Sequence, residues 1–158
     1  RPEQVAGVGA MEAFLSDGLR TLIQTLPNVR QMEEKTLRWP GHVAAIRPLL
    51  ASGRFLEEFR AQCVVDLPAD LVALVVRARW ADGTAQTITM VDRNDPKTGL
   101  TAMARTTAFT TSVMAQFAAA GGMPASGVLP PELIAANPDA VSFVIGKMAD
   151  RGVKFHRN

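Results

Sequence analysis

The segment QMEEKTLRWPGH, residues 31–42, packs two acids, a lysine, a threonine, an arginine and a histidine into one short run. Read as an extended strand, it places Thr36 and Arg38 on one side, because side chains alternate with a period of two in β-structure. The opposite side then carries Lys35, Leu37 and Trp39. Pro40-Gly41 predicts a turn that ends the strand, and His42 begins the next element. We expect the rest of the fold to be built around this segment.

Two interpretations of this segment are open. In the first, its charged side chains point into a shared cleft, either as Glu33 with Arg38 or as Lys35 with His42. In the second, it is a solvated edge strand whose charges prevent aggregation. Residue spacing alone does not decide between them.

Composition is that of an ordinary soluble globular protein. The 158 residues suit one domain with a sizeable core, and 47% hydrophobic and 20% charged residues are typical values. The net charge is only +2 and the basic residues are scattered, so we expect no nucleic-acid partner. The most apolar window, residues 100–120, is too polar to span a bilayer, so we expect no membrane partner.

Cysteine usage and the start of the chain bear on the cellular compartment. The one cysteine, Cys63, has no partner for an internal disulfide or a CxxC motif, so we expect no structural metal. We interpret Cys63 as a small apolar side chain. No secretion leader is visible, and a cytoplasmic location is the expectation.

The clearest local prediction is a β-hairpin. Residues 71–80 are rich in Val and Leu, residues 86–92 alternate Thr with Ile and Met, and Asp82-Gly83 is a turn signal. The face expected to meet the core carries Val72, Leu74, Val76, Ala78 and Trp80. Arg77 and Arg79 share the other face, where they either grip a dicarboxylate or form the wet side of an antiparallel sheet.

Apolar spacing and capping residues predict four main helices. The first covers about residues 17–26 with Ser16 as its N-cap, and the second, interrupted by Pro48, ends at Gly53. A long third helix starts at residues 98–99 and runs to about residue 120. The fourth starts at Asn137-Pro138-Asp139 and is followed by a strand over residues 153–155. Its expected core face consists of Val141, Val144, Ile145 and Met148.

Four motifs succeed one another along the chain in a characteristic order. They are EAFLSDGLRTL (residues 12–22), EKTLRWPGH (34–42), MVDRNDPKTGLTAMARTT (90–107) and GVLPPE (127–132). Together they resemble the substrate-side domain of the saccharopine dehydrogenase family, and the lysine 6-dehydrogenase-like members are the most similar. The resemblance covers nearly the whole chain.

This resemblance implies a fold and a domain organisation. It implies an α+β fold with a mixed, mainly antiparallel sheet and helices largely on one face, similar to the non-Rossmann domain of glyceraldehyde-3-phosphate dehydrogenase. Residue patterns alone support α+β but not that topology. Residues 1–158 then form a single substrate-binding and dimerisation domain. Family members carry a dinucleotide-binding Rossmann domain ahead of this region, and its glycine-rich motif is missing here.

The resemblance also implies an activity. Such enzymes move a hydride between NAD or NADP and the amine or imine carbon of a small amino acid, here lysine or a saccharopine-like substrate. We expect this domain alone to bind no cofactor and to be inactive, because the hydride carrier has no site on it. A homodimer is the expected assembly. The alternative is a non-catalytic dimerisation or interaction module that kept the fold and lost the chemistry.

Candidate roles for the segment at residues 31–42 come from the chemistry of its side chains. The planar guanidinium of Arg38 suits a substrate carboxylate. His42 or Asp17 is the candidate base, because a partly buried imidazole or carboxylate can titrate near neutrality, and the sequence does not rank them. Lys35 offers a second positive contact and Thr36 a hydroxyl group.

Three further expectations concern residues outside that segment. Asp17 and Gly18 lie at a predicted strand-to-helix corner whose free amides favour a substrate carboxylate, although simple capping explains the same residues. Arg105, near the start of the long helix, either reaches substrate or cofactor or serves to cap and pack the helix. At three positions the chain departs from the expected family pattern of tyrosine, tyrosine and glycine: Leu15, Trp39 and Ala108.

Overall fold

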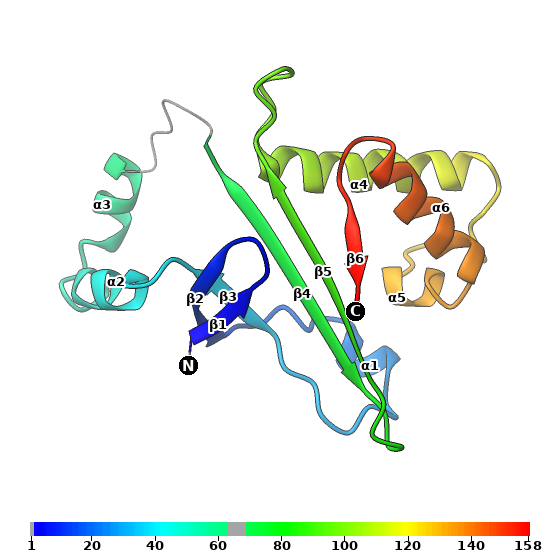
Figure 1. Ribbon diagram of the computed structural model, residues 1–158, viewed down its shortest axis with the longest axis horizontal. Coiled ribbons are helices and arrows are strands. Elements are labelled where there is room, and N and C mark those ends of the chain that lie inside the picture. Colours follow the sequence, from blue (N-terminus) through cyan, green and yellow to red (C-terminus); the bar gives the residue numbers. More distant parts are fainter. Residues whose placement is uncertain (1, 63–68) are drawn as a thin grey trace. The chain divides into compact units, whose positions relative to one another are not determined.

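The computed structural model describes residues 2–62 and 69–158, and Cys63 lies outside them (Figure 1). The chain forms two compact units that are interleaved in sequence. Unit 1 contains Arg1–Leu19 and Met32–Pro68, and unit 2 contains Arg20–Gln31 and Ala69–Asn158. No helix in the described ranges is long and apolar enough to cross a membrane.

Unit 1 is built on a small antiparallel sheet. Its strands β1 (Pro2–Val5), β2 (Gly9–Leu15) and β3 (Lys35–Arg38) lie in the order β1-β2-β3. Val5 and Met11 are the buried side chains of this sheet. The helices α2 (His42–Ala51) and α3 (Phe55–Gln62) come after β3 in the chain. Helix α2 continues through Pro48, so no second helix begins there, contrary to the interruption expected from the sequence. Gly53, at φ 71°, lies just past the end of α2, as the sequence predicts.

The prediction of a helix over residues 17–26 is wrong for most of that range. Only α1 (Leu22–Thr25) forms, and it belongs to unit 2, where the Thr25 hydroxyl donates to Glu132 at 2.8 Å. Arg20 adopts a positive φ of 47°, which interrupts a right-handed helix. Ser16 caps no helix, because its hydroxyl donates to Glu34 instead.

Unit 2 contains the predicted hairpin. Its strands β4 (Leu71–Arg79) and β5 (Ala85–Arg93) pair antiparallel, and β6 (Phe155–Arg157) adds to β5 in the order β4-β5-β6. Asp82 organises the turn by accepting a hydrogen bond from the Thr84 amide at 2.9 Å. The final strand starts two residues later than expected, because Val153 is fully buried in the core instead.

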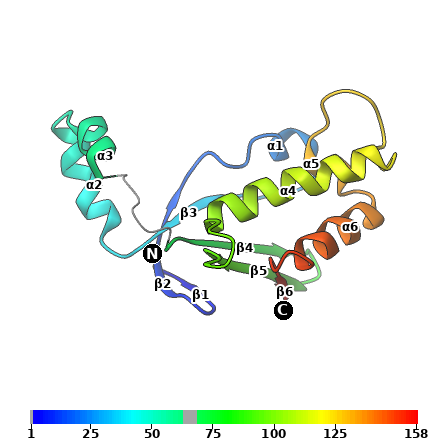
Figure 2. The same ribbon diagram turned by 90° about the horizontal axis from the view of Figure 1, so that it is seen from above.

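Three helices complete unit 2, namely α4 (Ala102–Ala119), α5 (Pro131–Ile134) and α6 (Pro138–Ala149). Figure 2 shows α4 running beside α6 along one side of the sheet. The main core cluster joins the sheet to both helices and consists of Met90, Val113, Met148 and Val153. Asn137 caps α6 as predicted, since its side chain accepts a hydrogen bond from the Asp139 amide. Helix α4 starts later than expected, with Thr101 as its N-cap.

The helices cover less of the hairpin than the sequence suggests. Val72 packs against the core, but Leu74, Val76 and Trp80 on the same predicted face are 41%, 48% and 52% exposed. The expected core face of α6 is also only partly buried, because Ala140 and Met148 are covered while Val141 and Ile145 are exposed. The α+β class is confirmed, with the strands arranged as two three-stranded antiparallel sheets.

Candidate functional site

The register between β2 and β3 brings four side chains to one face of the sheet in unit 1. Arg38 lies opposite Glu12, and Thr36 lies opposite Phe14. Side chains that are directly opposite in an antiparallel pair share a face, and their neighbours point the other way. The predicted alternation of Thr36 and Arg38 is therefore confirmed, and Glu12 and Phe14 join them.

His42 reaches the same face after the chain bends at Pro40-Gly41. Gly41 has a φ of 95°, a value that residues with a side chain rarely adopt, so glycine suits this bend. The His42 ring then stacks on Phe14, with ring centroids 6.3 Å apart and an interplanar angle of 4°. The bend thus gathers the imidazole, the Thr36 hydroxyl and the Arg38 guanidinium on one face of unit 1.

Glu12 holds this bend in place. Its two carboxylate oxygens accept hydrogen bonds from the Gly41 amide at 3.0 Å and from the Val43 amide at 2.9 Å. These amide donors, that of Val43 above all, and the nearby His42 imidazole hold the pKa of the Glu12 carboxyl below its usual value. Helix α2 begins at His42, so a carboxylate from β2 supplies the anion that a helix N-terminus favours.

Arg38 is exposed and remains available to an anion. Its guanidinium donates to the carbonyl of Leu37 at 2.8 Å. Arg38 forms no ion pair with any described residue. Glu12 lies directly across the strand pair, but its carboxylate oxygens accept hydrogen bonds from the amides of Gly41 and Val43 instead. A guanidinium with free donors can bind a carboxylate through two parallel hydrogen bonds.

The corner after β2 already contains an anion, and it comes from the chain itself. The Glu34 carboxylate accepts hydrogen bonds from the Ser16 hydroxyl and from the Gly18 amide, the latter at 3.2 Å. The hydroxyl oxygens of Ser16 and Thr36 lie 2.7 Å apart, which joins this corner to the face described above. The amide expected to bind a substrate carboxylate therefore binds Glu34.

Gly18 fits this corner because it has no side chain. A Cβ added to Gly18 would lie only 2.7 Å from Cδ of Glu34. Asp17, the alternative base, is exposed on the turn between Ser16 and Gly18. The Glu34 carboxylate at this corner is thus bound by one hydroxyl and one amide, and the Thr36 hydroxyl lies beside that of Ser16.

Lys35 lies on the opposite face of the sheet from Thr36 and Arg38. It pairs with Leu15 in the register, and its ammonium contacts Glu33 at 2.7 Å. Of the two pairs that could point into a shared cleft, Glu33 contacts Lys35 instead of Arg38, and Lys35 lies on the face opposite to Phe14, on which His42 stacks.

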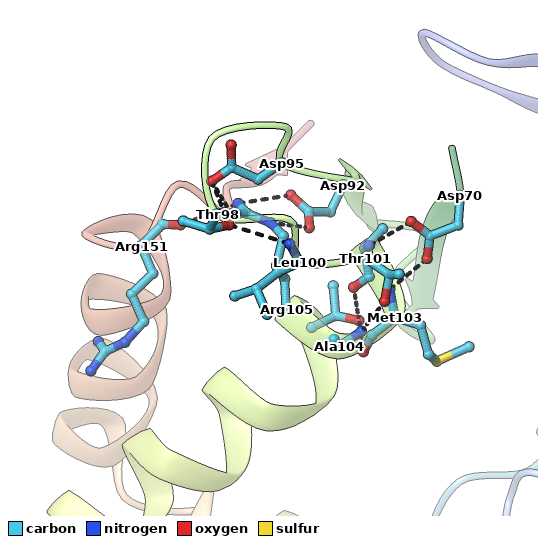
Figure 3. A network of polar contacts seen from close by, with 12 residues as sticks. Asp70, Asp92, Asp95, Thr98, Leu100, Thr101, Met103, Ala104, Arg105 and Arg151 are labelled. Atoms are coloured by element: carbon cyan, nitrogen blue, oxygen red, sulfur yellow. Dashed lines mark hydrogen bonds and ion pairs between the residues drawn. The ribbon is translucent and has the colours of Figure 1, made fainter. Parts of the chain in front are cut away.

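Arg105 belongs to unit 2, where it is only 8% exposed and is held by its own network (Figure 3). Its guanidinium donates to Asp92 at 2.8 and 3.3 Å, to Asp95 at 3.4 Å and to the carbonyl of Arg151 at 3.2 Å. The hydrogen bonds that Arg105 donates to Asp92 and the charges of both aspartates raise the pKa of the Arg105 guanidinium. The side chain thus ties the start of α4 to β5 and to the turn that follows α6.

A second carboxylate, Asp70, completes the start of α4 in Figure 3. It accepts hydrogen bonds from the amides of Ala102 at 2.6 Å and of Met103 at 2.9 Å. The Thr101 hydroxyl accepts from Ala104 at 3.0 Å. The free amides of this helix are therefore satisfied from within the chain.

Sequence reasoning did not assign a role to Glu12, Phe14 or Glu34. Glu12 and Phe14 are two residues apart on one strand, as Thr36 and Arg38 are on the next. This spacing is the sequence signal that could have placed all four side chains on one face. No sequence signal links Glu34 with Ser16, because the contact spans 18 positions. No group of three or more metal-ligating side chains gathers within residues 2–62 and 69–158.

Comparison with known proteins gives one family. A model of the saccharopine dehydrogenase C-terminal domain matches residues 2–153, which is nearly the whole chain. No solved structure matches the chain.

Proposed function

We propose that this chain, which belongs to the saccharopine dehydrogenase C-terminal domain family, is the substrate-binding domain of an NAD- or NADP-dependent dehydrogenase. The reaction would be hydride transfer at the amine or imine carbon of an amino acid, with L-lysine as the first substrate to test. The observation that carries this proposal is the shared face of β2 and β3, where Arg38, Thr36 and His42 gather.

Each of these three side chains has a role suited to an amino-acid substrate. Arg38 binds the substrate carboxylate, because its guanidinium has free donors and forms no ion pair in the described part of the chain. Thr36 offers a hydroxyl to orient the substrate. His42 accepts the proton from the substrate ammonium, and exposed Asp17 is the alternative base.

The remaining candidates have weaker support for direct contact with substrate. Lys35 forms an ion pair with Glu33 on the opposite face, and the Gly18 amide already donates to the Glu34 carboxylate. Arg105 is held by two aspartates in unit 2. We therefore propose that Lys35 and Gly18 order unit 1, that Arg105 orders unit 2, and that substrate binding is left to the shared face.

We propose that this chain by itself does not hold the nicotinamide cofactor. Its sequence has no G-x-G-x-x-G motif, the glycine pattern that lets a backbone approach a pyrophosphate. The proposal therefore places the dinucleotide on a Rossmann domain of the same protein. That cofactor would take up or supply the hydride, while this chain binds and orients the amino acid and handles its proton.

The two histidines of the chain provide a direct test of this function. In the full-length protein, turnover is followed as nicotinamide reduction with L-lysine and then with other amino acids. We expect His42→Asn to lower kcat by about 100-fold or more, the usual contribution of an acid–base group. The matched variant is His156→Asn, which changes an exposed residue on β6. Equal activity of both variants would reject His42 as the base, and would leave Asp17 to be tested in the same way.

A second candidate function is a dimerisation or interaction module, and one observation favours it. Strand β4 is an edge strand of its sheet, and its side chains Leu74 and Val76 are 41% and 48% exposed. A long edge strand with exposed apolar side chains invites pairing with another strand. The two functions are compatible, because the shared face lies in unit 1 and β4 in unit 2.

A further inference from the structure

Glu12 joins two segments that are 29 positions or more apart in the chain. From the middle of β2, its carboxylate reaches the amides of Gly41 and Val43, on either side of His42. The two distances, 3.0 and 2.9 Å, are those of good hydrogen bonds. No side chain of α2 itself caps the helix, because its N-cap residue is Gly41.

This contact holds the backbone on both sides of His42. The residue between two bound amides has little freedom to turn, and Phe14, two residues after Glu12 on the same face of β2, is the surface on which the ring stacks. One strand thus supplies both the clamp for the backbone and the platform for the imidazole.

The same contact affects Arg38. Glu12 lies directly opposite Arg38 in the register, so it is the nearest carboxylate that the strand pairing offers to the guanidinium. Each of its oxygens is already bound by a backbone amide, and no ion pair with Arg38 forms. The carboxylate thus contacts the bend at residues 41–43 and not the guanidinium proposed to bind the substrate.

We propose that Glu12 is a positioning residue: it sets His42 on Phe14 and leaves Arg38 open to an external carboxylate. The consequence for catalysis rests on the proposed function, whereas the placement of the two side chains does not. Glutamine at position 12 can accept from one amide through its oxygen, but its NH2 group cannot accept from the other. Alanine removes both contacts.

The placement is tested without any turnover. NMR of histidine-labelled full-length protein reports the ring-proton shifts of His42, assigned by their loss in His42→Asn. The stacked Phe14 ring displaces these shifts, and Phe14→Leu defines their values without stacking. We expect Glu12→Ala to move the His42 shifts to the Phe14→Leu values, and Glu12→Gln to move them part of the way. Unchanged His156 shifts in each variant show that the fold is kept.

Turnover then tests the consequence. We expect Glu12→Ala to lower kcat/KM by about 10- to 100-fold, as for a displaced catalytic group, and Glu12→Gln to lower it less. The matched control is Asp82→Asn, which removes a carboxylate that likewise binds a backbone amide, at 2.9 Å, in the hairpin turn. It should leave kcat/KM unchanged.

The outcomes separate the two claims. His42 shifts that stay at their wild-type values in Glu12→Ala would overturn the positioning role. A wild-type protein without nicotinamide-dependent turnover would overturn the proposed function, while displaced His42 shifts in Glu12→Ala would still establish the role of Glu12 in placing the ring.

Discussion

The rings of Phe14 and His42 lie parallel to within 4°, with their centroids 6.3 Å apart. Phe14 comes from β2, and His42 comes from the first turn of α2. The stack holds a titratable ring beside the strand pair that carries Thr36 and Arg38. The contacts that keep this arrangement together have measurable consequences.

Acid should weaken unit 1 through Glu12. Amide hydrogen bonds hold the folded pKa of this carboxyl below its ordinary value of 4.5. A carboxyl group whose pKa is lower in the folded protein than in the unfolded chain stabilises the fold at pH values above its unfolded pKa. This stabilisation is lost as the pH falls through the pKa of the folded state. We expect the urea midpoint of wild-type protein to fall more steeply below about pH 4.5 than that of Glu12→Gln. Urea midpoints that fall equally with pH in wild type and Glu12→Gln would contradict the role of Glu12 in the loss of stability in acid.

Removal of Arg105 should destabilise unit 2. Both Arg105 and Asp92 are nearly buried, so Arg105→Ala leaves an uncompensated carboxylate in the core. Breaking a buried pair in this way costs about 3–5 kcal/mol, measured as the loss in the free energy of unfolding by urea. The exposed pair of Lys147 and Asp150 is the comparison, and Asp150→Ala should cost less than about 1 kcal/mol. Equal effects of the two variants would contradict a structural role for Arg105.

Substitution of Gly18 should disturb the corner around Glu34. A Cβ at Gly18 would overlap the Glu34 side chain, so Gly18→Ala must displace that carboxylate from Ser16 and from the Gly18 amide. We expect a lower Tm, measured by circular dichroism. The matched variant Gly146→Ala lies on an exposed helix position with open space, and it should raise stability by up to about 1 kcal/mol. A Gly18→Ala variant as stable as Gly146→Ala would show that the corner is not tightly packed.

Strand β4 should mediate a homodimer if its edge pairs with a second copy. An antiparallel pairing centred on Val75 would place Leu74 opposite Val76 of the partner subunit, and Arg77 opposite an alanine rather than another arginine. We expect a dimer by light scattering, and a monomer for Leu74→Glu.

A charge-pair rescue tests this register. The double variant Leu74→Glu with Val76→Lys would place opposite charges across the interface and should restore the dimer. Val128→Glu, at a position 99% exposed in a loop of unit 2, is the control and should leave the dimer unchanged. A wild-type monomer, or a double variant that stays monomeric, would reject pairing through β4 in this register.

Local patterns in the sequence predict much of this fold. The hairpin is predictable because its turn signal at Asp82 and its strand residues act over a few positions. The alternation of Thr36 and Arg38 is predictable for the same reason, because a period of two belongs to every strand. The N-cap of α6 at Asn137 also depends only on its immediate neighbours.

Contacts between segments that are distant in the chain could not be predicted from the sequence. Ser16 has the propensity of an N-cap, but Glu34, which is 18 positions away, binds its hydroxyl and so overrides that propensity. The roles of Glu12 and Phe14 depend on the β2–β3 register, which no single segment specifies. The exposure of Leu74 depends on how far α4 and α6 extend over the sheet, and strand periodicity carries no information about that.

The KM of Arg38→Gln for the amino-acid substrate in the full-length enzyme tests the central claim most directly. Loss of a charge-assisted hydrogen-bonded pair with a carboxylate costs about 1.5–3 kcal/mol, so KM should rise by about 10- to 100-fold. The matched variant Arg79→Gln removes an exposed arginine from β4 and should keep the wild-type KM. The account predicts a raised KM for Arg38→Gln alone, and a KM equal to that of wild type and Arg79→Gln would contradict it.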